Sequence, residues 1–284
     1  MKIIEIRDLS FTYLGQSRPS LKNVNLEIGD GEFILVSGPS GGGKSTLCRC
    51  INGLIPHFYE GELRGEVLVN GLSTRTTPTY ILSQHVGMVF QNPQNQLFSL
   101  SVENDVAFAL ENLGLPRDEI RARVDEALEI MNLKDLADRS PLELSGGQQQ
   151  KVALASILAL RPRVIMLDEP TSFLDPASAL HLINVVDEIR RKFGLTILMV
   201  EHRVDMIAPS ATRMIVVYEG EITYDGPPRE FFEKYDAHLY GVSTPRLARL
   251  SGELAKRIDG WPGIFLDIDG FERAVRGLAS RRVR

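Results

Sequence analysis

Short stretches in which hydrophobic and polar residues alternate fill the first third of the chain. The segments KIIEIRDL, NVNLEI and EVLVNG follow this pattern, which predicts β-strands, and the last one ends in the turn-forming pair Asn70-Gly71. Phe33–Ser37 is instead a compact apolar segment that leads directly into glycines, as a buried strand would. A helix is expected to follow, from about Lys44 to Leu54.

Beyond residue 85, short apolar segments alternate with longer helical patterns. The expected strands and helices, in chain order, are a strand at 86–90, a largely helical region at about 92–160, a strand at 163–168, a helix at 176–193 and a strand at 195–201. Gly194 ends the last helix, because glycine readily adopts the left-handed conformation of a helix C-terminus. Strand–helix–strand order at this spacing predicts a parallel, doubly wound sheet.

Residues 213–224 are expected to form a hairpin that turns at Glu219-Gly220, and Pro227-Pro228 follows as a boundary signal. We therefore expect one domain over residues 1–226 and a small C-terminal region over residues 227–284.

The composition is that of a globular protein. Of the 284 residues, 43% are hydrophobic and 24% are charged, and the formal net charge of -5 at pH 7 argues against nucleic acid as a partner. The charge is uneven, because residues 271–284 contain five arginines and one glutamate and so carry +4. This basic tail either contacts anionic lipid headgroups or forms a solvated terminus.

Other features place the chain in a reducing compartment and outside the bilayer. Cys48 and Cys50 lie two positions apart on an expected helix and point to different faces, so we interpret them as reduced thiols of a cytoplasmic protein. The charged N-terminal segment is not a signal peptide, and the longest apolar run, Val152–Leu160, is too short to cross a bilayer. Work at a membrane would require recruitment by a partner.

The glycines after the strand at 33–37 belong to the pattern G-x-x-x-x-G-K-[ST], which extends over Gly38, Pro39, Ser40, Gly41, Gly42, Gly43, Lys44, Ser45 and Thr46. Glycines allow backbone N–H groups to turn around phosphates, and the start of the following helix attracts the same negative charge. Lys44 is expected to reach the β- and γ-phosphates, and Ser45 to ligate Mg²⁺. The alternative is a chance match in a glycine-rich turn. A chance match would not be expected to have the strand before the glycines and the helix after them that are predicted here.

Two acids, Asp168 and Glu169, end the apolar strand at 163–168. In an open parallel sheet the ligand lies beyond the carboxyl ends of the strands, so Asp168 is expected to hold Mg²⁺, directly or through water. Glu169 is then expected to polarise the attacking water as a general base. Solvated acids at the start of a loop are the alternative.

A second anion site is predicted at Ser145, Gly146, Gly147 and Gln148, where a helix-capping serine is followed by two glycines that expose backbone N–H groups. By itself this is also consistent with an ordinary capped helix. Between the phosphate loop and the acid pair, however, it resembles the signature motif of ATP-binding-cassette (ABC) ATPases. In that family the motif contacts ATP held by the phosphate loop of a second subunit, so two chains enclose two nucleotides head to tail.

Other residues match the ABC pattern. The resemblance implies that Tyr13 stacks on adenine, that Gln91 contacts Mg²⁺ or water, that Asp175 acts across the dimer and that His202 contacts the γ-phosphate. It covers residues 1 to about 226 and implies an Mg-ATP hydrolase of the P-loop NTPase fold. That fold has a mostly parallel core sheet flanked by helices, an antiparallel β subdomain, a helical subdomain at about 92–160 and here a C-terminal appendage.

The segment Val86–Phe98 is similar to that of energy-coupling-factor (ECF) ATPases, which drive importers of cobalt, nickel or vitamins. This resemblance implies a second ATPase subunit, identical or related, a polytopic coupling subunit, a substrate-binding membrane subunit and a peripheral position on the cytoplasmic face of the cell membrane. Leu97, Phe98 and the following helix are expected to contact the coupling subunit, and residues 227–284 to help pair the ATPases.

Two other functions remain open from the sequence. One is a soluble ABC ATPase that acts on nucleic acid or another macromolecular complex, and the other is a non-catalytic scaffold, against which the intact Glu169 and His202 argue. A chromosome-organising ATPase is excluded because the interval between Ser45 and Ser145 has no room for long coiled coils. The transported solute is not encoded in these motifs.

Overall fold

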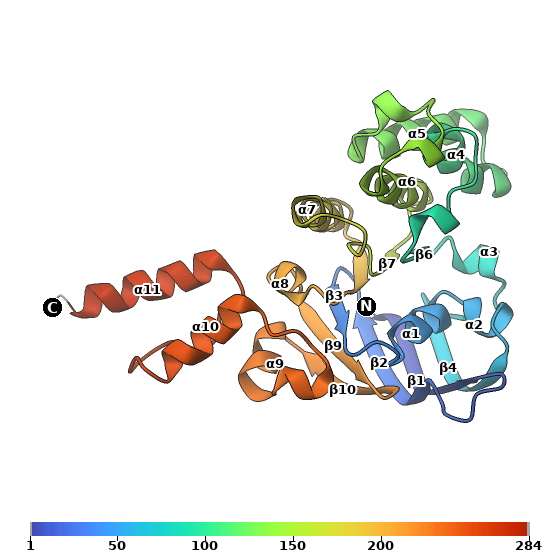
Figure 1. Ribbon diagram of the computed structural model, residues 1–284. Helices are drawn as coiled ribbons and strands as arrows, with labels where there is room; N and C mark the ends of the chain where they lie inside the picture. Colours follow the sequence, from blue (N-terminus) through green and yellow to red (C-terminus); the bar gives the residue numbers. More distant parts are fainter. Residues whose placement is uncertain (1, 283–284) are drawn as a thin grey trace.

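Two sheets form the centre of the computed structural model, which describes residues 2–282 (Figure 1). The larger has the strand order β10-β9-β3-β8-β7-β6. Its strands are β3 (Phe33–Ser37), β6 (Val86–Val89), β7 (Val164–Asp168), β8 (Thr196–Val200), β9 (Arg213–Tyr218) and β10 (Glu221–Gly226). All neighbouring pairs are parallel except β9 and β10, which form the predicted hairpin. The predicted α/β fold with a mostly parallel core sheet is confirmed.

The smaller sheet is antiparallel and has the order β2-β1-β4-β5. Its strands are β1 (Lys2–Tyr13), β2 (Leu21–Gly29), β4 (Gly61–Val69) and β5 (Leu72–Ser73). Asn70-Gly71 forms the turn between β4 and β5, and both residues have positive φ, as a tight hairpin turn requires. This sheet supplies the predicted antiparallel β subdomain.

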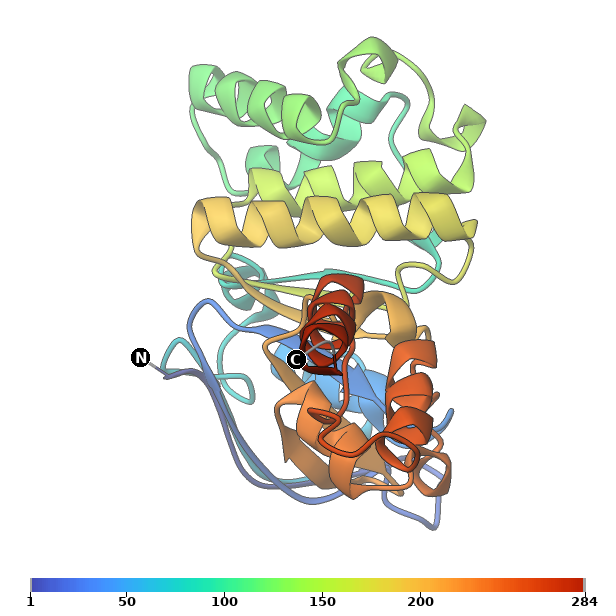
Figure 2. The same ribbon diagram turned by 90° about the vertical axis from the view of Figure 1, so that its left-hand side faces the viewer.

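Helices cover both faces of the larger sheet. They are α1 (Lys44–Ile51), α2 (Leu54–His57), α3 (Thr79–Leu82), α4 (Val102–Asn112), α5 (Arg117–Ile130), α6 (Gly146–Ala159), α7 (Pro176–Phe193), α8 (Val204–Ile207), α9 (Pro228–Lys234), α10 (Arg246–Ala255) and α11 (Ile268–Arg282). Helices α4, α5 and α6 lie together at one end of the molecule, and α7 runs alongside α6 (Figures 1 and 2). None of the helices in residues 2–282 combines the length and apolar composition that a membrane span requires.

Strand β3 shows why its sequence is apolar at every position. Ile34, Leu35 and Val36 are all fully buried, but successive side chains enter different cores. Leu35 joins the core formed with helices α4–α7, whereas Ile34 and Val36 join the core shared with the antiparallel sheet and α1. A strand buried on both faces shows no alternation, which is the pattern seen for 33–37.

One predicted boundary is wrong. The first helix ends at Ile51 and not at Leu54, because Gly53 has a φ of 79° and interrupts the helical backbone before the short helix α2. By contrast, α7 ends at Phe193 with Gly194 in the left-handed conformation, as predicted.

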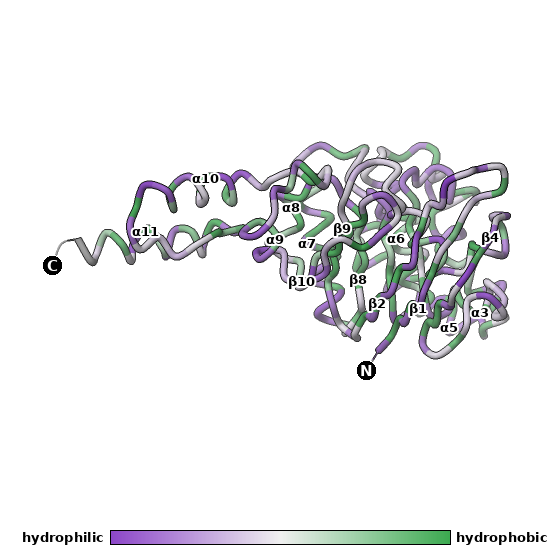
Figure 3. The backbone as a smooth tube through the Cα atoms, turned by 90° about the horizontal axis from the view of Figure 1, so that it is seen from below, coloured by the Kyte–Doolittle hydropathy of each residue, from purple (hydrophilic) through white to green (hydrophobic). Residues whose placement is uncertain are grey.

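The C-terminal region begins with α9, which packs on the last hairpin through the rings of Phe231 and Tyr224, 5.1 Å apart. Helices α10 and α11 then extend away from the sheets (Figures 1 and 3). The arginines at 273 and 276 of the basic tail are exposed on α11, whereas Arg284 lies outside the described residues. The division of the chain at residues 226 and 227 remains a prediction.

Candidate functional site

The predicted phosphate loop joins β3 to α1 at the carboxyl edge of the larger sheet. Gly38 and Gly43 have φ values of 132° and 111°, which disfavour any residue with a side chain. A Cβ at Gly38 would lie 2.1 Å from the carbonyl oxygen of Val217, and one at Gly43 would lie 2.6 Å from that of Ser20. The loop is therefore confined by its neighbours and keeps its curved backbone only with glycine at these positions.

Gly42 is enclosed in the same way, since a Cβ there would lie 2.8 Å from the Val217 oxygen. The sequence predicts that glycine at this position preserves the loop. The geometry supports that prediction, because a larger residue would require the β9 backbone to move.

The side chain of Lys44 folds back onto the phosphate loop that precedes it. Its Nζ donates to the carbonyl oxygens of Gly38 at 2.9 Å and Pro39 at 2.8 Å, and the residue is buried. Burial lowers the pKa of Lys44, while the charges of Glu169 and Asp168 oppose that shift. The ammonium group is thus held inside the loop, where phosphate oxygens would replace the two carbonyls.

Ser45 and Asp168 meet at the end of β7. Ser45 Oγ donates to Asp168 Oδ1 over 3.2 Å, and burial raises the pKa of Asp168 against the effect of this hydrogen bond. These two hard oxygen donors suit Mg²⁺, which keeps most of its ligands as water and phosphate oxygens. Within residues 2–282, no group of three acidic, histidine or cysteine side chains is placed to hold a metal ion, so Mg²⁺ would depend on oxygens of the bound nucleotide.

Glu169 occupies the centre of the site. Its Oε2 accepts hydrogen bonds from Gln91 Nε2 at 2.7 Å and Ser172 Oγ at 3.1 Å, and its Oε1 lies 3.2 Å from His202 Nε2. The residue has a φ of 49°, and its backbone N–H donates to Val200 at the end of β8. The structure therefore brings together three predicted catalytic side chains from β6, β7 and β8.

The sequence reasoning assigned no role to Glu201, which precedes His202. Its buried carboxylate accepts hydrogen bonds from the backbone N–H groups of Thr171, His202 and Arg203, and from the Thr171 hydroxyl. It therefore joins the segment after Glu169 to the segment that carries His202. The sequence signal that could have identified Glu201 is its position, since it is an acid between an apolar strand and the candidate histidine.

Gln96 was also missed. Its Oε1 accepts from the Phe90 N–H at 2.8 Å and its Nε2 donates to Met88 O at 3.0 Å, so it fixes the segment around Gln91 to the end of β6. Nothing in the sequence separates Gln96 from the other glutamines of this polar segment.

Tyr13 lies beside the phosphate loop, at the end of β1. Its hydroxyl accepts from Arg49 at 2.9 Å and lies 3.2 Å from the Thr46 hydroxyl. The ring packs edge-on against Phe11 and Tyr59. These contacts hold the ring next to α1 and the phosphate loop.

The second predicted anion site lies elsewhere in the chain. Ser145 and Gln148 form a reciprocal capping box at the start of α6, and Gly147 lies against Leu174. Asp175 caps α7 by accepting from the N–H groups of Ala177 and Ser178, and its hydrogen bonding to Ser178 lowers its pKa. No hydrogen bond between residues 2–282 joins Ser145 or Asp175 to the phosphate loop.

A parallel sheet with a glycine loop, a lysine and an acid pair at its carboxyl edge defines a P-loop nucleotide hydrolase. A family model described as ABC transporter matches residues 21–172. A Pyrococcus horikoshii protein, named as an ABC transporter ATP-binding protein, is 44% identical over 258 residues, which cover 90% of this chain and 91% of the relative. A relative of the same description from Caldanaerobacter subterraneus is 43% identical over 83% of this chain, which spans 41% of that longer protein.

Solved structures are similar as well. One is cbiO1 from Clostridium perfringens, part of the ABC transporter complex cbiONQ, with 34% identity, a TM-score of 0.75 and coverage of 90% of this chain and 99% of that one. Another is a dimeric ATP-binding cassette in a post-hydrolysis state with ADP and Pi, with 30% identity, a TM-score of 0.69 and coverage of 80% and 99%. The chain belongs to the ABC transporter family and is an ATP-binding, ATP-hydrolysing subunit of a transporter.

Proposed function

We propose that the chain energises an ECF-type importer of a metal ion or vitamin by driving an ATPase dimer between closed and open states. The observation that carries this proposal is the link between Gln91, which is hydrogen-bonded to Glu169, and the exposed apolar residues that follow it in the chain. The similarity to cbiO1 of the cbiONQ complex supports the same class of transporter.

The proposed catalytic roles belong to residues whose positions are described above. Lys44 and the backbone of the phosphate loop hold the β- and γ-phosphates, and Tyr13 stacks on the adenine. Ser45, Asp168 and Gln91 would hold Mg²⁺, which would neutralise charge at the phosphates. Glu169 takes the proton of the attacking water, and His202 orients Glu169 and contacts the γ-phosphate.

The active site requires a second ATPase subunit, identical or related. Ser145–Gln148 and Asp175 lie at the N-termini of α6 and α7, outside the group formed by Lys44, Asp168 and Glu169. In a head-to-tail dimer the free N–H groups of Gly146 and Gly147 would face the γ-phosphate held by the partner. The similar cassette that is dimeric with ADP and Pi supports this arrangement.

Residues 227–284 offer a second contact between the ATPase subunits. Helices α10 and α11 extend from the body and expose Leu250, Ile268 and Val275, which are 45%, 72% and 43% accessible. Apolar side chains exposed on adjacent helices favour pairing with a second copy or a related chain.

The surface for the coupling subunit differs from the sequence prediction. Leu97 is 6% exposed and packs in the core with α4, so it cannot contact a partner. The exposed residues are Phe98, Leu100 and Phe108, with the rings of Phe98 and Phe108 packed edge-on at 4.6 Å. Through this surface, a polytopic membrane subunit and its substrate-binding partner would hold the ATPase at the cytoplasmic face of the membrane.

Charge substitution tests the proposal directly. The double variant Phe98→Glu, Leu100→Glu should separate the ATPase from native membranes while its basal ATPase rate stays within about twofold, because neither side chain touches Glu169. Leu180→Glu, at an exposed position on α7, serves as the matched control and should leave co-purification unchanged. Full membrane retention of the double variant would contradict the docking surface. Co-purification with nucleic acid or a soluble complex, and not with a polytopic protein, would favour an ATPase that acts on macromolecules.

A further inference from the structure

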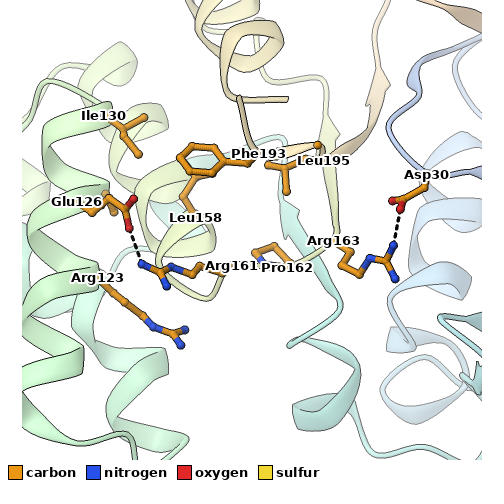
Figure 4. A pocket seen from close by; sticks show the side chains of 12 residues that line it. Asp30, Arg123, Glu126, Ile130, Leu158, Arg161, Pro162, Arg163, Phe193 and Leu195 are labelled. Atoms are coloured by element: carbon orange, nitrogen blue, oxygen red, sulfur yellow. Dashed lines mark hydrogen bonds and ion pairs between the residues drawn. The ribbon is translucent and has the colours of Figure 1, made fainter. Parts of the chain in front are cut away.

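A cavity of about 530 Å³ lies between the helical subdomain and the core sheet (Figure 4). Arg123 on α5 and Leu158 near the end of α6 line one side. Arg163 before β7, Leu195 before β8 and Phe193 at the end of α7 line the other. Its volume falls in the range of small-molecule sites.

The cavity lies at the opposite edge of the sheet from the catalytic residues. Arg163 directly precedes β7, whereas Asp168 and Glu169 end it, so the five-residue strand separates the two by about 15 Å. Leu195 is related to His202 in the same way through β8. Nucleotide bound at Lys44 would therefore leave this cavity free.

Three arginines line the cavity, and the side chains of Arg123 and Arg161 lie on the same side of it, whereas Arg163 points toward Asp30 (Figure 4). Arg161 donates to Glu126 at 2.7 Å, and Arg163 pairs with Asp30 (Figure 4). Arg123 pairs with Glu119 and donates a long hydrogen bond of 3.5 Å to the carbonyl oxygen of Ala159. A guanidinium has five N–H donors, so these ion pairs leave donors available for a further acceptor. Such planar groups are well suited to a carboxylate, sulfonate or phosphate.

The rest of the wall is apolar. Leu158, Leu195 and Ile130 line it together with Phe193, which is 42% exposed (Figure 4). A small inorganic anion would leave this surface uncovered, and a purely apolar ligand would leave the arginine donors unused. The lining therefore favours a ligand that has both an acidic group and an apolar body.

We propose that this cavity binds an amphipathic organic anion, with its acidic group at Arg123 and Arg161 and its apolar body against Phe193 and Leu158, and that occupancy changes the rate of ATP hydrolysis. Leu158 lies near the C-terminal end of α6, and Ser145, which caps the other end, is about 20 Å away along the helix. A ligand that contacts both α6 and the strands favours one orientation between them, because its affinity depends on that orientation.

The binding half can be tested with 8-anilinonaphthalene-1-sulfonate as the probe, followed by fluorescence on the full chain. One saturable site is expected, and Arg161→Met and Leu158→Trp should each raise its Kd at least tenfold, by removing donors and by filling the cavity. Arg121→Met, at an exposed arginine on α5, should leave the Kd within twofold. Circular dichroism checks the fold of each variant, and Phe193→Ser at the exposed edge provides a second test if Leu158→Trp does not fold.

Two results would overturn the binding site. Equal Kd values in all variants would show adventitious probe binding to exposed apolar surface, and displacement by Mg-ATP would place the probe in the nucleotide site. The proposed effect of the ligand on ATP hydrolysis rests on the proposed function, and a separate ATPase measurement tests it. Saturating probe should change kcat for ATP at least twofold in the unsubstituted chain and not in Leu158→Trp. Unchanged kcat with retained binding would refute regulation, whereas a chain without ATPase activity would count against the catalytic assignment alone.

Discussion

The Nε2 atom of His202 lies 3.2 Å from Oε1 of Glu169, although 33 positions separate the two residues (202 − 169). The register of β7 and β8 causes this contact, because Asp168 is paired with Val200 and each catalytic residue follows its strand. Gln91 reaches the other oxygen of the same carboxylate from the next strand, β6. One carboxylate thus connects the ends of three parallel strands.

The first prediction concerns Glu169→Gln. An amide cannot take a proton from water, so steady-state ATP hydrolysis should fall by roughly 10²–10⁴-fold, the usual contribution of a general base. ATP should still bind and should favour the dimer, since Lys44 and the loop are unchanged. Phosphate release and size-exclusion chromatography with ATP measure the two effects. Glu188→Gln, an exposed position on α7, is the control, and undiminished turnover in Glu169→Gln would refute the role of base.

The second prediction concerns Glu201→Gln. All four groups bonded to this buried carboxylate are donors, two at each oxygen. Glutamine replaces one of these oxygens with an N–H₂ group, which would then face two donors and could not accept from them. The free energy of unfolding should fall by about 1–3 kcal/mol, and kcat should fall with it as the His202 segment loosens. Urea unfolding and ATPase rates test this, with the exposed Glu221→Gln as control. Stability equal to the control would argue against the bridging role.

The third prediction compares Gly241→Ala with Gly194→Ala. Both glycines have left-handed backbones, with φ values of 64° and 66°, so each alanine should cost about 1–2 kcal/mol of stability. Only the Cβ at position 241 would meet Pro39 of the phosphate loop, at 2.8 Å, whereas that at 194 has no atom within 4 Å. Gly241→Ala alone should therefore raise the KM for ATP, by several-fold in a steady-state assay. Equal KM values in the two variants would show that the C-terminal region does not affect the loop.

The fourth prediction concerns thiol reactivity. Burial raises the pKa of Cys50 to about 12, so its thiolate fraction at pH 8 is about one in ten thousand, against roughly a quarter for an unperturbed thiol. Burial also raises the pKa of Cys48. Both thiols of the native protein should react slowly with a chromogenic disulfide reagent at pH 8, and rapidly in denaturant. Fast labelling of the folded chain would contradict the burial of α1.

Local sequence determined much of this protein. The glycine loop, the capping serine and the acid pair are each defined by chemistry within a few residues, and α7 begins at a helix-favouring proline and ends before a glycine. Such features depend on backbone conformation and short-range hydrogen bonds, so they can be identified without knowing which segments lie side by side.

Tertiary structure decided the rest. Leu97 and Phe98 are adjacent and similar in hydrophobicity, yet Leu97 is buried in the core that includes α4 and Phe98 is exposed, because burial depends on which face another element covers. The bridging role of Glu201 and the contact of Gly241 with Pro39 also depend on partners that are distant in sequence. The arginine-lined cavity exists only because α5, α6 and two strand starts converge, and no local pattern encodes that convergence.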